Sequence, residues 1–150
     1  MIRLLEKDKT IPYELLLLAD ETIEAINKYI HQSDIYVLDR DDTIIAVLVL
    51  QTICCDTVEI KNIAVDTAYQ GQGIGQGLLK DAINLAKEKG FQKIIIGTGD
   101  AGIKQLYIYQ KVGFEMYDIK HRFFLDHYPE PIFENGIQLK HMIMLKKELK

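Results

Sequence analysis

The chain has 150 residues, of which 48% are hydrophobic and 27% are charged, as is typical of one globular domain and not of a disordered chain. Its 18 Lys and Arg against 22 Asp and Glu give a net charge of −4, which argues against a nucleic-acid-binding module with its basic face. No apolar stretch reaches the roughly 20 residues of a membrane-spanning helix, and residues 1–9 do not resemble a secretion signal. We expect one cytoplasmic domain over residues 1–150, without nucleic-acid or membrane partners.

The first half of the chain predicts strands interrupted by two short helices. A helical stretch begins at Pro12, and Asp20 is placed to cap a second helix. The β-branched and Leu residues of 44–50 are typical of a strand covered on both faces. Strands are expected at residues 1–6, 35–38, 44–50 and 58–65. Alternation along the last of these predicts that Glu59, Lys61, Ile63 and Val65 share one face.

The second half contains the strongest helical pattern. Apolar residues recur every three to four positions over 73–89, and Gly90 follows where a left-handed residue ends a helix. A second helix over 103–112 ends in the same way at Gly113. Strands are expected at 93–97, 114–119 and 140–145, and a loop at 127–136. This order predicts an α/β or α+β fold, in which helices enclose a mixed sheet.

The two cysteines, Cys54 and Cys55, are adjacent. Neighbouring positions on a strand point to opposite faces, so a disulfide between them would be strained, and two cysteines alone do not make a zinc site. We expect both to be small buried hydrophobes. The four histidines show no metal-ligand spacing, and we expect no metal site.

A glycine-rich segment precedes the helix of residues 73–89. It comprises Gln70, Gly71, Gln72, Gly73, Ile74, Gly75 and Gln76. Glycine is costly in an ordinary helix, so this density suggests a backbone that is closely approached, and free amides at a helix start bind phosphate. The spacing fits neither the dinucleotide fingerprint nor the P-loop. The alternative is a glycine turn without a ligand.

Two motifs together resemble a known family. Residues 70–75 match the [RQ]-x-x-G-x-[GA] signature of the GCN5-related N-acetyltransferases, and residues 106–114 resemble the family's second signature, a helix that ends in Y-x-K-x-G-F. The resemblance covers residues 44–114 by motif and the flanks by element order. It implies a six- to seven-stranded mixed sheet with helices on both faces and a splayed central strand pair.

The resemblance also implies an activity, transfer of the acetyl group of acetyl-CoA to a primary amine by direct attack in a ternary complex. The amides of residues 70–76 would bind the pyrophosphate. The pantetheine arm would pair with the strand edge at Ile63, Ala64 and Val65, and the Ile63 amide would stabilise the oxyanion.

The same resemblance implies two catalytic residues. Glu59 falls where the histone-acetyltransferase branch has its general base, and Tyr109 matches the tyrosine that protonates the departing thiolate. The alternatives are that Glu59 pairs with Lys61 and that Tyr109 only packs its ring. Gly102 stands where many members have an asparagine that binds the pantetheine, which puts that contact in doubt.

The acceptor groove of the family corresponds here to residues 12–33 and 121–136. The second segment mixes aromatic residues with Asp126, Glu130 and Glu134, which could hold a small-molecule or peptide amine. The alternative is a rigid, ligand-free loop, or one that builds a homodimer. For the chain as a whole, the rival interpretations are a non-catalytic acyl-CoA-binding sensor and a structural or interaction protein.

Overall fold

The computed structural model describes residues 1–149, which form one mixed sheet and a separate short hairpin. The seven-stranded sheet has the order β1-β2-β3-β4-β5-β9-β6, and β7 pairs with β8. The strands are β1 (Arg3–Leu4), β2 (Asp34–Arg40), β3 (Thr43–Cys54), β4 (Thr57–Val65), β5 (Lys93–Gly99), β6 (Glu115–Lys120), β7 (Phe133–Glu134), β8 (Ile137–Gln138) and β9 (Met142–Glu148). The helices are α1 (Tyr13–Leu16), α2 (Ile23–Asn27), α3 (Ile74–Glu88), α4 (Ile103–Lys111) and α5 (Phe123–His127), with 3-10 turns η1 (Ile30–Gln32) and η2 (Thr67–Tyr69).

Helices cover both faces of the sheet, as predicted. One core lies beneath α3 and α4 and includes Leu78 and Tyr109, and the other lies beneath α1 and α2 and includes Leu16 and Ile26. Residues 45–50 of β3 are all buried between these two cores, which confirms the strand covered on both faces.

The amphipathic helix α3 forms where the sequence predicts it. Leu78, Ala82 and Ala86 are buried on its inner side, and Gly90 follows its end with φ +84°, a conformation that glycine adopts at little cost. The helix therefore holds the glycine-rich segment at its N-terminal end against β4, since α3 and β4 are in contact.

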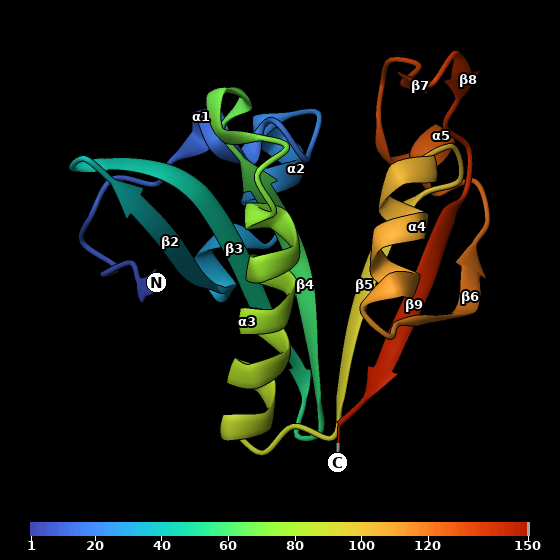
Figure 1. The fold of residues 1–150 in the computed structure, drawn as a ribbon. Helices are drawn as coiled ribbons and strands as arrows, with labels where there is room; N and C mark the ends of the chain where they lie inside the picture. Colours follow the sequence, from blue (N-terminus) through green and yellow to red (C-terminus); the bar gives the residue numbers. More distant parts are fainter. Residues whose placement is uncertain (150) are drawn as a thin grey trace.

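Strands β4 and β5 separate along their length. They run parallel, and only Thr57–Ile60 of β4 pairs with Lys93–Ile96 of β5. Beyond Ile60 the two strands diverge into a V, which is visible between the green and yellow strands of Figure 1. The edge of β4 over Ile63–Val65 that faces β5 therefore has no strand partner. The splayed pair implied by the family resemblance is present.

A β-bulge interrupts β4 at Lys61. Leu50 of β3 pairs with Ile60 and Val49 pairs with Asn62, so Lys61 has no opposite residue. The extra residue reverses the alternation of faces. The prediction that Glu59 shares a face with Ile63 and Val65 is therefore wrong.

The bulge places β4 side chains on two faces. Ile60 and Ile63 both pack in the core beneath α3, whereas Asn62 bonds to the backbone of α1. Glu59, next to Ile60, points to the side of the sheet that α1 and α2 cover, on the same face as Asn62.

Two further predictions are wrong. Cys54 and Cys55 are exposed, not buried, because they lie at the tip of the β3–β4 hairpin, where the flanking residues 52–56 are mostly exposed. The cap of α2 is Thr22, whose hydroxyl accepts from the Ala25 amide at 3.0 Å. Asp20 does not cap the helix, because its carboxylate bonds to tyrosine hydroxyls.

The expected loop at 127–136 is partly a hairpin. Asn135 and Gly136 have φ +54° and +77°, which is the two-residue turn that connects antiparallel strands, here β7 and β8. The Asn135 side chain donates to Ala101 O at 2.9 Å. This bond ties the tip of the hairpin to the loop between β5 and α4.

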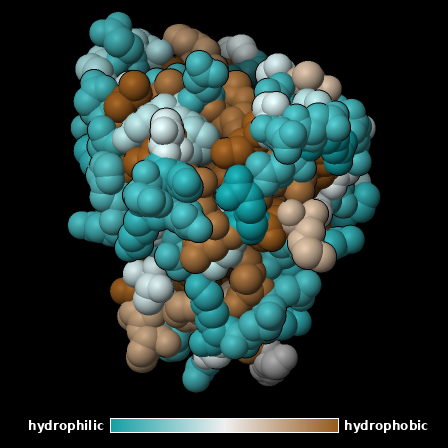
Figure 2. Space-filling view, turned by 90° about the vertical axis from the view of Figure 1, so that its left-hand side faces the viewer, coloured by the Kyte–Doolittle hydropathy of each residue, from teal (hydrophilic) through white to brown (hydrophobic). Residues whose placement is uncertain are grey.

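One face of the molecule is mostly polar. Figure 2, which looks at the left-hand side of Figure 1, shows hydrophilic residues over most of that face and apolar residues gathered near its middle. Among residues 1–149, no helix has the length and apolar character needed to cross a bilayer.

Candidate active site

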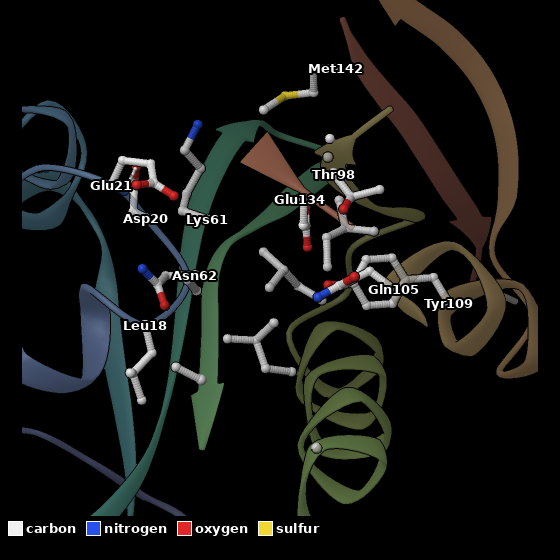
Figure 3. Close-up of a pocket in the computed structure, with 18 of the residues that line it drawn as sticks. Leu18, Asp20, Glu21, Lys61, Asn62, Thr98, Gln105, Tyr109, Glu134 and Met142 are labelled. Atoms are coloured by element: carbon white, nitrogen blue, oxygen red, sulfur yellow. Dashed lines mark hydrogen bonds between the residues drawn. The ribbon is translucent and has the colours of Figure 1, made fainter. Parts of the chain in front are cut away.

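A cleft of about 900 Å³ opens between the diverging strands, which is within the usual size of a small-molecule site. Its walls come from β4, β5, the start of α3, α4, the α1–α2 turn and the segment that follows β6. Figure 3 shows side chains from both halves of the sheet facing this space. Glu59, Ile63, Ala64, Val65, Gln70, Gly71, Gly73, Ile74, Gly75, Gln76 and Tyr109, all predicted from the sequence, line it, and the predicted Gln72 does not.

At one end of the cleft, the backbone amides are free. No acceptor within the described chain receives the amides of residues 71–76, whereas the Gly77 amide donates to Gly73 O at 3.1 Å. Gly71 and Gly73 have φ +80° and +83°, and a Cβ at either position would meet no atom within 4 Å. Free amides and open space at the start of a 15-residue helix make a site for an anion such as a diphosphate.

The glycine-rich segment is held against β4. The Gln70 amide nitrogen Nε2 donates to Val65 O at 2.9 Å, and the Asp66 carboxylate accepts from the Ala68 amide at 2.9 Å. These bonds fix the free amides next to the unpaired edge of β4. An extended molecule can therefore contact both at once.

Tyr109 reaches the middle of the cleft from α4. The residue is 8% exposed, and its hydroxyl has no hydrogen-bond partner among residues 1–149. Burial, and then the charge of Glu134, raises the pKa of Tyr109 to about 12, so the phenol remains protonated at neutral pH. A protonated and unpartnered hydroxyl that faces the cleft is available to donate to a bound molecule.

Glu59 lies at the base of the cleft on β4. It is 8% exposed, and its carboxylate lies 3.5 Å from Lys61 Nζ. The ion pair that the sequence offered as an alternative is therefore formed. Lys61 also lies over the ring of Tyr29, 5.4 Å from its centroid, so both charges remain at the cleft wall.

Gln105 lies next to Gly102, the position where many family members have an asparagine that binds the pantetheine. A Cβ at Gly102 would come within 2.9 Å of Thr98 Oγ1, so no side chain fits at this position without movement. Gln105, on the first turn of α4, points into the cleft next to Tyr109 in Figure 3. An amide is thus present here although the asparagine is missing, and the motif comparison had not identified it.

A hydrogen-bonded chain closes the other end of the cleft. Asn62 Nδ2 donates to Tyr29 Oη at 3.1 Å, and Tyr29 Oη donates to Asp20 at 3.2 Å. Tyr128 Oη, 108 residues away in sequence, donates to the same carboxylate at 2.6 Å. This chain joins the α1–α2 turn to the segment after β6, and no local sequence pattern indicated it.

Only one of three predicted acceptor carboxylates reaches the cleft. Glu134 on β7 lines it, whereas Asp126 pairs with Arg122 on the surface at 3.5 Å and Glu130 is exposed outside the cleft. Glu21, which the sequence analysis did not single out, lines the cleft from the α1–α2 turn.

Comparison with known proteins identifies the family. The model of the acetyltransferase (GNAT) family matches residues 1–114. The chain belongs to the GNAT acetyltransferase family. It is 45% identical over 137 residues to the uncharacterized N-acetyltransferase YvbK of Bacillus subtilis, covering 91% of this chain and 88% of that protein.

Solved structures agree with this assignment. A GNAT acetyltransferase from Elizabethkingia anophelis with acetyl-CoA bound is 48% identical, with a TM-score of 0.96 over 99% of this chain and 97% of that one. A Bacillus cereus protein described as an IAA acetyltransferase is 42% identical, with a TM-score of 0.94 over 99% of each chain. The co-substrate of this GNAT enzyme is acetyl-CoA, and the free amides of residues 71–76 suit its diphosphate.

Proposed function

We propose that this GNAT enzyme transfers the acetyl group of acetyl-CoA to a primary amine of a small molecule or peptide by direct attack within a ternary complex. The observation that carries the proposal is the cleft between β4 and β5. It combines an anion site, an unpaired strand edge, a buried phenol and a carboxylate. A ternary complex fits because these groups share one space.

The free amides of residues 71–76 would hold the pyrophosphate, whereas the predicted Gln70 amide donates to Thr67 O at 3.5 Å. The N-terminus of α3 would add about 0.3–1 kcal/mol of dipole attraction. The pantetheine arm would add a short strand to β4 at Ile63, Ala64 and Val65. Gln105 would contact this arm in place of the absent asparagine. The Ile63 amide would donate to the carbonyl oxygen as it becomes negative.

Glu59 would act as the general base and Tyr109 as the general acid. The amine nitrogen forms a bond to the acetyl carbon and the carbon–sulfur bond breaks, while the nitrogen's proton passes to Glu59, directly or through water. Tyr109 gives its proton to the departing thiolate, and the products are an amide and CoA. An alkylamine with a pKa near 10.4 is neutral in about one molecule per thousand at pH 7, so a base near the amine is useful.

Two measurements test the proposal together. Saturating CoA should raise the melting temperature, because a ligand that binds only the folded state stabilises it. Thiol release from acetyl-CoA should then depend on an added amine, and IAA belongs in the acceptor panel because of the description of the Bacillus cereus relative. Stabilisation by CoA without turnover of any acceptor would instead favour a non-catalytic acyl-CoA sensor.

A further inference from the structure

Two carboxylates lack a partner at the end of the cleft that is lined by the α1–α2 turn and the segment after β6. We call it the acceptor end, because the proposed amine would bind there. Glu21 and Glu134 line this end from opposite parts of the chain, and neither forms an ion pair among residues 1–149. Asp20 differs, because its oxygens accept from Tyr29 and Tyr128. Glu21 and Glu134 are therefore the acidic groups that remain open to a ligand.

No cation that lines the cleft forms an ion pair with Glu21 or Glu134 among the described residues. Burial, and then the negative charge of Glu21, raises the pKa of Glu134; a cation nearby would have the opposite effect. Four lysines also line the cleft. Lys61 is paired with Glu59, and Lys28, Lys104 and Lys120 form no ion pair with either carboxylate in the described chain.

A second observation points to a ligand at the same place. The Tyr109 hydroxyl belongs to a residue that is 8% exposed, and it has no partner among residues 1–149. Figure 3 shows Tyr109 and Glu134 directed towards the same part of the cleft, with Glu21 and Asp20 across from them. Among the described residues, the buried side-chain oxygen without a hydrogen-bond partner is Asn62 Oδ1, and Asn62 lines the same cleft. A buried acceptor without a partner is costly, so a ligand group that donates a hydrogen bond is expected here.

The reaction itself limits which cation can satisfy these carboxylates. The attacking nitrogen must lose its positive charge before it can form a bond to carbon. It therefore cannot supply the charge that Glu21 and Glu134 need throughout the reaction. A second nitrogen that remains protonated can do so, and the apolar Leu18, Phe124 and Ile132 on the same walls suit a methylene chain between the two.

We propose that the acceptor is a linear aliphatic diamine or polyamine, whose second, protonated nitrogen is held by Glu21 and Glu134 while the first is acetylated. This inference rests on the proposed acetyl transfer. The reacting nitrogen first loses one proton to solvent and is then neutral. It forms the C–N bond as the C–S bond breaks, its second proton goes to Glu59, and Tyr109 supplies one proton to the thiolate. The second nitrogen keeps its proton, so the product carries one positive charge.

The test uses three acceptors of matched length, which are 1,4-diaminobutane, n-butylamine and 4-aminobutanoate. Thiol release with acetyl-CoA gives kcat/KM for each. Because a hydrogen bond to a charged group is strong, we expect the diamine to exceed n-butylamine by about tenfold or more. The value for 4-aminobutanoate should be lower still, since its carboxylate would face Glu21 and Glu134.

Variants connect this preference to the two carboxylates. Glu21→Gln and Glu134→Gln should each reduce the ratio of diamine to n-butylamine, whereas Glu130→Gln, on the same segment but exposed outside the cleft, should leave the ratio unchanged. Melting curves show whether each variant is folded. An unchanged ratio in both cleft variants would overturn the inference.

The acceptor panel separates this inference from the proposed function. If kcat/KM for n-butylamine or 4-aminobutanoate equals that for the diamine, the proposed acetyl transfer stands and the diamine inference is wrong. If none of the three releases thiol although CoA raises the melting temperature, the inference fails and the proposed transfer to aliphatic amines fails with it.

Discussion

Replacing Gly73 by alanine tests the anion site against a control on the same helix. Gly73 precedes α3 with φ +83° and Gly90 follows it with φ +84°, and a Cβ at either position would meet no atom within 4 Å. The strain in the two variants is therefore the same, about 1–2 kcal/mol for an alanine in the left-handed region. For a chain of this size, each kcal/mol lowers the melting temperature by about 2–4 °C.

CoA affinity should distinguish the two variants. The methyl group of Gly73→Ala would project beside the free amides of residues 71–76, whereas that of Gly90→Ala would lie at the far end of α3. Calorimetric titration should show that the Kd for CoA rises about tenfold or more in Gly73→Ala, equivalent to about 1.4 kcal/mol. It should change little in Gly90→Ala. Equal affinities in the two variants, at equal loss of stability, would refute the anion site.

Three further substitutions test the remaining groups. Tyr109→Phe should lower kcat by about 10²-fold, with little change in the Kd for CoA; the opposite pattern would make Tyr109 a binding residue. Glu59→Gln should slow transfer and move the pH dependence upward, because the rate would then follow the neutral amine, and an unchanged pH profile would remove Glu59 from the reaction. Tyr128→Phe loses the 2.6 Å bond to Asp20 and should raise the acceptor KM and destabilise the fold by about 1 kcal/mol. Tyr13→Phe, which loses an exposed bond of 2.6 Å, should not alter the acceptor KM.

The sequence predicted the elements whose side-chain pattern is local. The apolar period of α3, the glycines at its two ends and the β-branched run of β3 each reflect the conformation of their own segment. The motif comparison then placed the free amides and Tyr109 in one cleft. These features could be predicted because neighbouring residues determine them.

The bulge at Lys61 could not be read from alternation. An extra residue in a strand leaves the side-chain types unchanged but reverses which face they occupy. The faces of Glu59 and Ile63 depend on the register with β3, which pairs Leu50 with Ile60 and Val49 with Asn62. The error therefore arose from long-range pairing.

The acceptor end also depends on contacts between distant segments. Asp20 was predicted to cap a helix because its sequence neighbours are helical, but its carboxylate instead accepts hydrogen bonds from Tyr29 and Tyr128. Glu134 was one of three acidic residues in its segment, and only the β7–β8 hairpin determines that it faces the cleft. Sequence alone gave the composition of this end but not its geometry.

The amide resonances of the glycine-rich segment test the central claim most directly. In a ¹H–¹⁵N spectrum recorded during titration with CoA, the amides of residues 71–76 should shift most, together with those of the unpaired β4 edge at 63–65, while the amide of Gly90 at the far end of α3 stays in place. Saturation by CoA with the resonances of 71–76 unmoved would contradict the account.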